Sequence, residues 1–226
     1  MLPTMTVSEA IEARHSVRAF TDQPVSQLTV RSLLEKASQA PSGGNLQPWV
    51  IHALAGGQLE RLKSAVLGKL ERGERETGEY AIYPPGLPEP YRRRRREAGA
   101  QRYAALGIAR EEDGMAVLER MNFVFFGAPI GLFFCIDRRM GPPQWADLGM
   151  FMQSFMLLAV EAGLATCPQE IWSTWPRTVA AELGLPDELM IFAGMSLGYE
   201  DKASPINSYR TMRAPLENFA ILRGFD

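Results

Sequence analysis

Apolar residues recur at helical spacing in several parts of this chain. Residues 6–14 place Val7, Ala10 and Ile11 on one face of a predicted helix, and Ser26 suits the N-cap of a second helix that ends at Pro41. Four further segments have the same periodicity: 58–70, 111–126, 144–163, and a helix that Thr174 would cap and Gly184 would end. The chain is therefore expected to be rich in amphipathic helices.

Four segments between these helices have strand patterns. Residues 49–55 alternate between apolar and polar side chains, and residues 129–137 form a compact apolar run that predicts a central strand. Residues 165–170 are a short strand or loop, and 189–199 are the last clear strand. Strands separated by helices give an α/β or α+β sheet of four or five strands.

The most apolar stretch, residues 148–160, is interrupted by Gln153. It is shorter than the ~20 residues that cross a bilayer, so it predicts a helix buried on all sides, not a membrane span. Complete burial in a chain this small is easier if a second subunit covers one face. The tail from Ser204 onward is long and extended, which is typical of a segment that wraps around a partner. We therefore expect a homodimer.

Residues 73–99 break the periodic pattern with interleaved prolines and tyrosines, followed by the run Arg92–Arg96. The flanking segments read as parts of one domain, so we interpret residues 73–112 as an insertion within a single domain of residues 1–226. Because glutamates lie nearby, the arginine run is interpreted as a solvated helix start and not as a nucleic-acid patch.

Composition supports a soluble enzyme-sized domain. The chain has 226 residues, 46% of them hydrophobic, and a formal charge of −2, which argues against nucleic acid or an anionic membrane as partner. Its two cysteines form no disulfide framework, and its first residues lack the pattern of a signal peptide, so a cytoplasmic location is expected. With only His15 and His52, a histidine-rich metal site is not expected.

Two segments near the N-terminus carry the candidate chemistry. Residues 14–18 (Arg-His-Ser-Val-Arg) offer guanidiniums suited to phosphate oxygens, and residues 40–49 form a Gly-rich loop whose Ser and Asn could approach a planar ring closely. Together they suggest a phosphorylated aromatic cofactor. The alternatives are a cation-decorated helix end and an ordinary helix-to-strand connection.

Two later segments extend this picture. Residues 166–170 (Thr-Cys-Pro-Gln-Glu) follow the apolar helix directly and could place backbone groups beside a ring, or could be a strand edge that tolerates proline. The tail carries Arg210 and Arg213, three residues apart, which could bracket an anion or lie in solvent.

Taken in order, these segments resemble the FMN-dependent nitroreductase family. The resemblance rests on four stretches: residues 14–20, 40–49, 163–169 and 213–217. It implies an α+β fold with a central, mostly antiparallel sheet flanked by helices, and a dimer that binds FMN at the subunit interface.

The resemblance also implies roles for individual residues. Arg14 and Ser16 would contact the phosphate and ribityl end, with His15 beside them, and Arg18 would lie near the pyrimidine edge of the flavin. Pro41, Ser42, Gly43 and Asn45 would come from the other subunit. Pro168 and Gln169 would lie by the ring's reactive nitrogen, and Arg213, with Arg210, would bind the phosphate. Tyr83 and Tyr91 of the insertion could form a lid over a flat aromatic substrate, or the insertion could be a solvent-exposed surface excursion.

The implied activity is reduction of nitroaromatic or quinone-like acceptors by NADH or NADPH through FMN. No side chain need act as acid or base, because the hydride chemistry belongs to the flavin. No Rossmann-type glycine motif is present, so the nicotinamide donor would visit the flavin and leave before the acceptor binds, with ping-pong kinetics. The alternatives are another flavin reaction on the same scaffold, such as reductive dehalogenation or flavin breakdown, and a flavin-binding protein without turnover.

Overall fold

A four-stranded antiparallel sheet forms the centre of the molecule. The computed structural model describes residues 5–108 and 114–225. Its strands are β1 (Val50–Ala55), β2 (Ile130–Asp137), β3 (Ala165–Gln169) and β4 (Leu189–Gly198), in the order β1-β2-β4-β3, and every neighbouring pair is antiparallel. The expected α+β architecture is confirmed.

Seven α-helices surround the sheet within the described part of the chain. They are α1 (Val7–Ala13), α2 (Gln27–Ala37), α3 (Gly56–Glu71), α4 (Tyr91–Ala105), α5 (Gly114–Phe123), α6 (Pro142–Glu161) and α7 (Pro176–Leu183).

Strand β2 is buried on both faces because helices cover both sides of the sheet. Side chains alternate along a strand, so Leu132 and Phe134 point to one face and Phe133 and Cys135 to the other. The first pair packs in a cluster with residues of α2 and α6. The second pair packs with residues of α3, α5 and α7. The result is a helix–sheet–helix arrangement.

Gly194 shows how closely the second layer approaches the sheet. A Cβ at this position of β4 would lie 2.3 Å from Cδ1 of Trp172, so only glycine leaves room for the indole. That indole stacks on Phe125 with ring centres 4.6 Å apart. The segment that follows β3 is thereby fixed against the sheet.

Several helix ends differ from the sequence expectation. Helix α2 begins after the Ser26 cap as predicted but ends at Ala37, before Pro41. The helix predicted over residues 111–126 is α5, and residues 111–113 lie outside the described part. This helix ends at Phe123 and not at residue 126, because Phe125 and Phe126 have positive φ.

The start of α7 also corrects the sequence analysis. Thr174 does not cap the helix, because its hydroxyl donates to the carbonyl of Ile171 instead. The backbone N–H groups of Arg177 and Thr178 donate to the carboxylate of Glu76, about 100 residues earlier in the chain. Gly184 ends the helix in the left-handed conformation, as predicted.

Helix α6 is not buried on all sides within a single chain, so the complete burial that the sequence predicts would need a second subunit. One face packs on the sheet and on α2. The opposite side carries a stripe at helical spacing, in which Ala146, Met150 and Gln153 are exposed and Leu157 is partly exposed. Met150 is 39% exposed.

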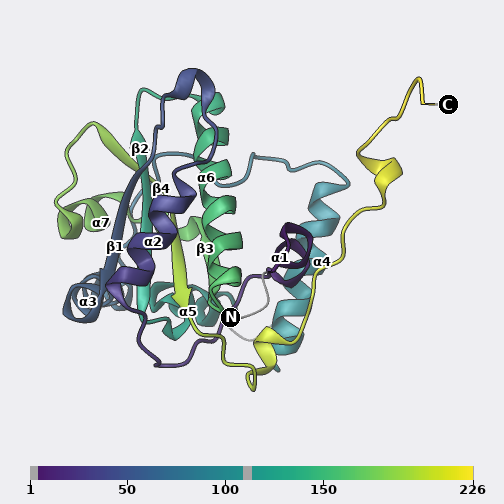
Figure 1. Cartoon of the computed structure of the whole chain (residues 1–226). Coiled ribbons are helices and arrows are strands. Elements are labelled where there is room, and N and C mark those ends of the chain that lie inside the picture. The colour runs from purple at the N-terminus through teal and green to yellow at the C-terminus, as the bar shows by residue number, and fades with distance from the viewer. Residues whose placement is uncertain (1–4, 109–113, 226) are drawn as a thin grey trace.

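The insertion and the tail lie together on one side of the body. Figure 1 shows α4 on the other side of α6 from the sheet, with the yellow C-terminal tail running along α4 and then projecting away. The tail's last apolar side chains are exposed, including Phe219 at 71%. No helix among residues 5–108 and 114–225 is long and apolar enough to span a membrane.

Candidate functional site

The N-terminal arginine segment lies against the outer edge of β3. Ser16 forms a parallel bridge with Thr166, and the backbone N–H of Val17 donates to the carbonyl of Thr166 at 3.0 Å. Val17 is fully buried, so it anchors the segment while the residues on either side remain partly exposed. The pairing brings Arg14, Ser16 and Arg18 to the first residues of the candidate ring-binding strand.

The tail holds Arg18 in place from the other side. The buried Asn207 accepts the backbone N–H of Arg18 at 2.7 Å and donates to the carbonyl of Ala19. The Arg18 guanidinium donates to the hydroxyl of Tyr209 at 2.8 Å and to the carbonyl of Ser16 at 3.2 Å. Residues nearly 190 positions apart are therefore built into one local structure.

Positive charges gather around the buried start of β3. Burial lowers the pKa of Arg14, and the charge of Arg213 lowers it further. Burial raises the pKa of the Cys167 thiol, while the guanidiniums of Arg18, Arg102 and Arg14 act against that rise. Among the described residues, none of these four arginines forms an ion pair with a carboxylate. A cluster of like charges at a half-buried place is suited to an anion.

Arg102 was missed by the sequence analysis. It lies on α4, six residues after the run Arg92–Arg96, and in the sequence it resembles these solvated arginines. A signal was present: Ala98, Gln101, Arg102 and Ala105 lie on one side of the helix at helical spacing, and the structure buries each of them in part.

Three of the predicted phosphate-end residues have other partners within the chain. The exposed Arg213 guanidinium donates to the carbonyl and the hydroxyl of Thr211 at 2.9 and 2.8 Å. The imidazole of His15 lies 3.0 Å from the carboxylate of Glu200 and 3.0 Å from the carbonyl of Ala13. The Arg210 guanidinium donates to the carbonyls of Asn207 and Tyr209. These contacts fix the two segments that carry Arg14 and Arg213.

Pro168 and Gln169 have different environments although they are neighbours. Pro168 is half-buried, whereas the Gln169 side chain is only 2% exposed. Its amide donates to the backbone carbonyl of Asn122 at 2.8 Å and accepts from the hydroxyl of Ser196 at 2.8 Å. The Gln169 side chain therefore ties β3 to α5 and β4, and only its backbone is left to face a ligand.

The glycine-rich loop lies at the other end of α6. The backbone N–H of Gly43 donates to the buried carboxylate of Asp147, near the start of the helix, and Ser42 accepts from the backbone of Gln47. The arginine segment lies by Thr166, just beyond the end of α6. At 1.5 Å per residue, Asp147 and the last residue of α6, Glu161, are about 20 Å apart along the helix axis. One chain does not bring Pro41, Ser42, Gly43 and Asn45 to Arg14.

Tyr83 and Tyr91 lie at the far end of the insertion. Tyr83 is 47% exposed, and the guanidinium of Arg95 lies 4.2 Å from its ring centre. Tyr91 opens α4, so it lies about 16 Å along the helix axis from Arg102. Within one chain, the two tyrosines are not part of the arginine cluster.

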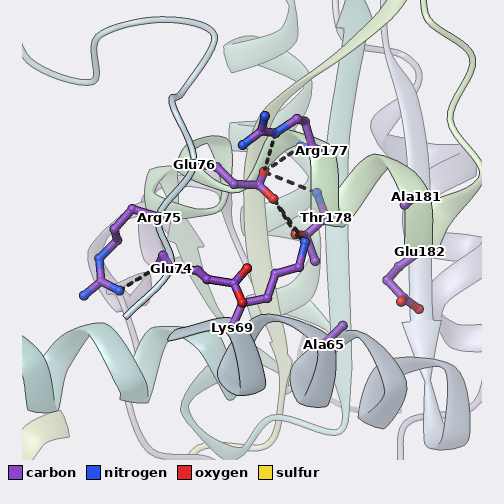
Figure 2. Close-up of a pocket in the computed structure, with 9 residues that line it drawn as sticks. All are labelled: Ala65, Lys69, Glu74, Arg75, Glu76, Arg177, Thr178, Ala181 and Glu182. Carbon is purple, nitrogen blue, oxygen red and sulfur yellow. Dashed lines mark hydrogen bonds and ion pairs between the residues drawn. The ribbon is translucent and has the colours of Figure 1, made fainter. Parts of the chain in front are cut away.

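A polar cavity of about 320 Å³ between α3 and α7 is a structural feature and not a second site (Figure 2). Its central carboxylate, Glu76, is occupied by the start of α7 and by Lys69, whose ammonium lies 3.5 Å away. A groove of about 430 Å³ lies between α4 and the tail, and Arg93, Arg94 and Arg213 line it together with Glu97. Among the described residues, no group of His, Cys, Asp and Glu could hold a metal ion.

Comparison with known proteins places this geometry in a family. The model of the nitroreductase family matches residues 11–199. The chain belongs to the nitroreductase family. It is 37% identical to a 4-nitrobenzoate reductase from Pseudomonas putida over 217 residues, which cover 96% of this chain and 95% of that protein.

Solved structures agree with this placement. The crystal structure of the FMN- and NADPH-dependent nitroreductase NfnB from Sphigopyxis sp. strain HMH matches with a TM-score of 0.94 and 44% identity, covering 97% of this chain and 100% of that one. The FMN-dependent NfnB from Mycobacterium smegmatis, in complex with NADPH, matches with a TM-score of 0.91 and 31% identity, covering 96% and 97%. The resemblance inferred from the sequence is confirmed.

The side chains near β3 are chemically suited to FMN. Arg14 and Arg213 could neutralise a phosphate dianion, and Ser16 is paired with Thr166 of the strand. The hydroxyl of Thr166 is buried without a hydrogen-bond partner among the described residues. A ribityl chain, with several hydroxyl groups, could satisfy it.

Proposed function

We propose that this protein is a homodimeric FMN-dependent oxidoreductase that uses NADPH or NADH to reduce nitroaromatic or quinone-like acceptors. The observation that carries the proposal is the cluster of Arg14, Arg18 and Arg213 around the start of β3, with no carboxylate partner within residues 5–108 and 114–225, in a chain of the nitroreductase family. Relatives that reduce 4-nitrobenzoate, or that depend on FMN and NADPH, support the same activity.

Different residues would bind different parts of FMN. Arg14 and Arg213 would bind the phosphate, and Ser16 would contact the ribityl end. Arg18 would place a positive charge near the pyrimidine edge of the ring, where negative charge accumulates on reduction. Bound FMN would supply the hydride chemistry. The backbone after Pro168, fixed by the buried Gln169 side chain, would lie along the reactive edge of the ring.

A second chain would complete the site. The loop carrying Pro41, Ser42, Gly43 and Asn45 lies about 20 Å from the arginine segment along α6, so the two contact one cofactor only if they come from different subunits. The exposed apolar side chains of the tail and the exposed stripe on α6 support the homodimer.

The visible spectrum of the purified protein tests the proposal. We expect flavin absorption bands that disappear when NADPH is added without oxygen and return when 4-nitrobenzoate is added. Parallel initial-rate lines on double-reciprocal plots would indicate the ping-pong order. Flavin bands that NADPH and NADH leave unchanged would instead support a flavin-binding protein without turnover, and a protein without flavin affinity would contradict the proposal.

A further inference from the structure

The insertion helix reaches the arginine cluster through the tail. Helix α4 packs against the 3-10 turn Pro205–Asn207, and Asn207 of this turn holds the backbone of Arg18. The groove between α4 and the tail is lined by Arg213 as well. Figure 1 shows the tail running along this helix. The C-terminal half of α4 therefore belongs, together with the tail, to the wall of residues around the start of β3.

Arg102 is the residue that α4 contributes to this wall. Its side chain is partly buried, and its Nε atom is buried without a hydrogen-bond partner among the described residues. A buried guanidinium nitrogen without an acceptor is energetically unfavourable, because the nitrogen has lost water and gained nothing in exchange. The position therefore calls for an acceptor that a ligand could supply.

The other arginines of α4 lack this property. Arg92 and Arg93 lie within ion-pair distance of glutamates on or beside the same helix. Arg94 and Arg95 lie over the rings of tyrosines. Arg96 is exposed.

Arg102 also shares its surroundings with the predicted phosphate-binding residues. The charges of Arg102, Arg18 and Arg14 all reach the buried thiol of Cys167, and the charge of Arg213 reaches Arg14. Guanidiniums that gather around one buried position repel one another unless an anion lies among them. The dianionic phosphate of FMN is the anion that the proposed function supplies.

We propose that Arg102 is a further cationic contact of the FMN phosphate, so that the insertion helix α4 is a structural part of the cofactor site. This inference rests on the proposed function. Its consequence is that loss of FMN releases the repulsion that the phosphate had balanced, and α4 then packs less firmly against the tail.

Two flavins that differ only in the phosphate provide the test. The flavin-free protein is titrated with FMN and with riboflavin, and quenching of flavin fluorescence gives the Kd of each. The variants are Arg102→Gln and, as a matched control on the same helix, Arg96→Gln. Circular dichroism and thermal melting confirm that both variants are folded.

For Arg102→Gln we expect the Kd of FMN to rise about 10- to 100-fold, as the loss of a hydrogen bond between charged groups implies. The Kd of riboflavin should stay unchanged, and Arg102→Lys should recover part of the FMN affinity. Arg96→Gln should change neither Kd. Limited proteolysis within α4 should be slower with FMN present, and this protection should be lost in Arg102→Gln.

Three results would overturn the assignment. An FMN affinity unchanged in Arg102→Gln but reduced in Arg14→Gln would remove Arg102 from the phosphate site and leave the proposed function standing. Equal losses of FMN and riboflavin affinity would assign Arg102 to the packing of the helix. A wild-type protein that binds neither flavin would contradict the proposed function itself.

Discussion

Replacing Glu76 with glutamine should destabilise the protein, because its carboxylate joins the start of the insertion to α7. The side chain is only 5% exposed. It accepts the backbone N–H groups of Arg177 and Thr178 at 2.8 and 3.3 Å, and the hydroxyl of Thr178 at 2.5 Å (Figure 2). Because no side chain next to α7 caps the helix, this distant carboxylate takes the place of an N-cap.

The magnitude follows from these three hydrogen bonds. A hydrogen bond to a charged group contributes about 1.5–3 kcal/mol and a neutral one about 0.5–1.5 kcal/mol, so neutralising the acceptor weakens each by about 1 kcal/mol. With one acceptor oxygen replaced by an amide nitrogen, the total loss should be about 2–4 kcal/mol. For a chain of this size, Tm should fall by about 4–16 °C. Differential scanning calorimetry at equal protein concentration measures this change, with Glu182→Gln in the same cavity as the control.

The pH dependence gives an independent check. Burial alone would raise the pKa of Glu76, but the hydrogen bonds from Thr178 and Arg177 and the charge of Lys69 outweigh it and lower the pKa below 4.5. The carboxylate therefore contributes its full stability above pH 4.5 and loses it as the pH falls through the lower, folded-state value. Wild type and Glu76→Gln should differ at pH 7 and converge at an acid pH below the lowered folded-state pKa of Glu76. A Tm difference that is the same at both pH values, or a variant as stable as Glu182→Gln at pH 7, would refute this account of Glu76.

Three further predictions concern the cofactor site, the tail and the core. Arg14→Ala and Arg213→Ala should each weaken FMN binding by about 10- to 100-fold, measured as the flavin content after purification and dialysis; if both retain full flavin, the phosphate assignment is wrong. Deleting residues 216–226 should yield a monomer by light scattering that binds FMN poorly, and a truncated protein that remains a flavin-loaded dimer would contradict the role of the tail. Gly194→Ala should lower stability by about 1–3 kcal/mol through overpacking, whereas Gly68→Ala on α3, where a Cβ would lie 3.5 Å from the end of the Arg72 side chain, should be neutral or stabilising in thermal melts.

The sequence predicted most of the fold because the strongest patterns are local. The compact apolar run at residues 129–137 became the central strand β2, and the Ser26 cap and the Gly184 stop lie where the local residues placed them. The cap of α7 could not be predicted, because the groups that satisfy its N–H donors come from Glu76, far away in the chain. Local patterns report hydrogen bonds between neighbours and are silent about partners brought close by the fold.

In the candidate site, too, the sequence predicted local motifs but not the contacts between distant parts of the chain. The motif around Arg14 and Ser16 could be read from the sequence, and the structure places it at the edge of β3. The contact of Arg18 with Asn207 could not, because it joins opposite ends of the chain. Arg102 could not be predicted either, because in the sequence it resembles the solvated arginines 92–96 of the same helix. Only its burial distinguishes it from Arg96. Burial depends on tertiary packing, which sequence spacing indicates only weakly for a charged residue.

The two ends of α6 give a geometric reason for the proposed dimer to have twofold symmetry. The glycine-rich loop lies at the start of the helix, beside Asp147, and the arginine segment lies beyond its end, beside Thr166. A twofold axis perpendicular to α6 would place two copies antiparallel, so that the start of one helix meets the end of the other. Each loop would then face the partner's arginine segment, and both sites would form at once. The exposed stripe on α6, centred on Met150, is the surface through which such a pair could pack. A substitution that separates the subunits should therefore remove both FMN sites together, and a half-occupied dimer is not expected.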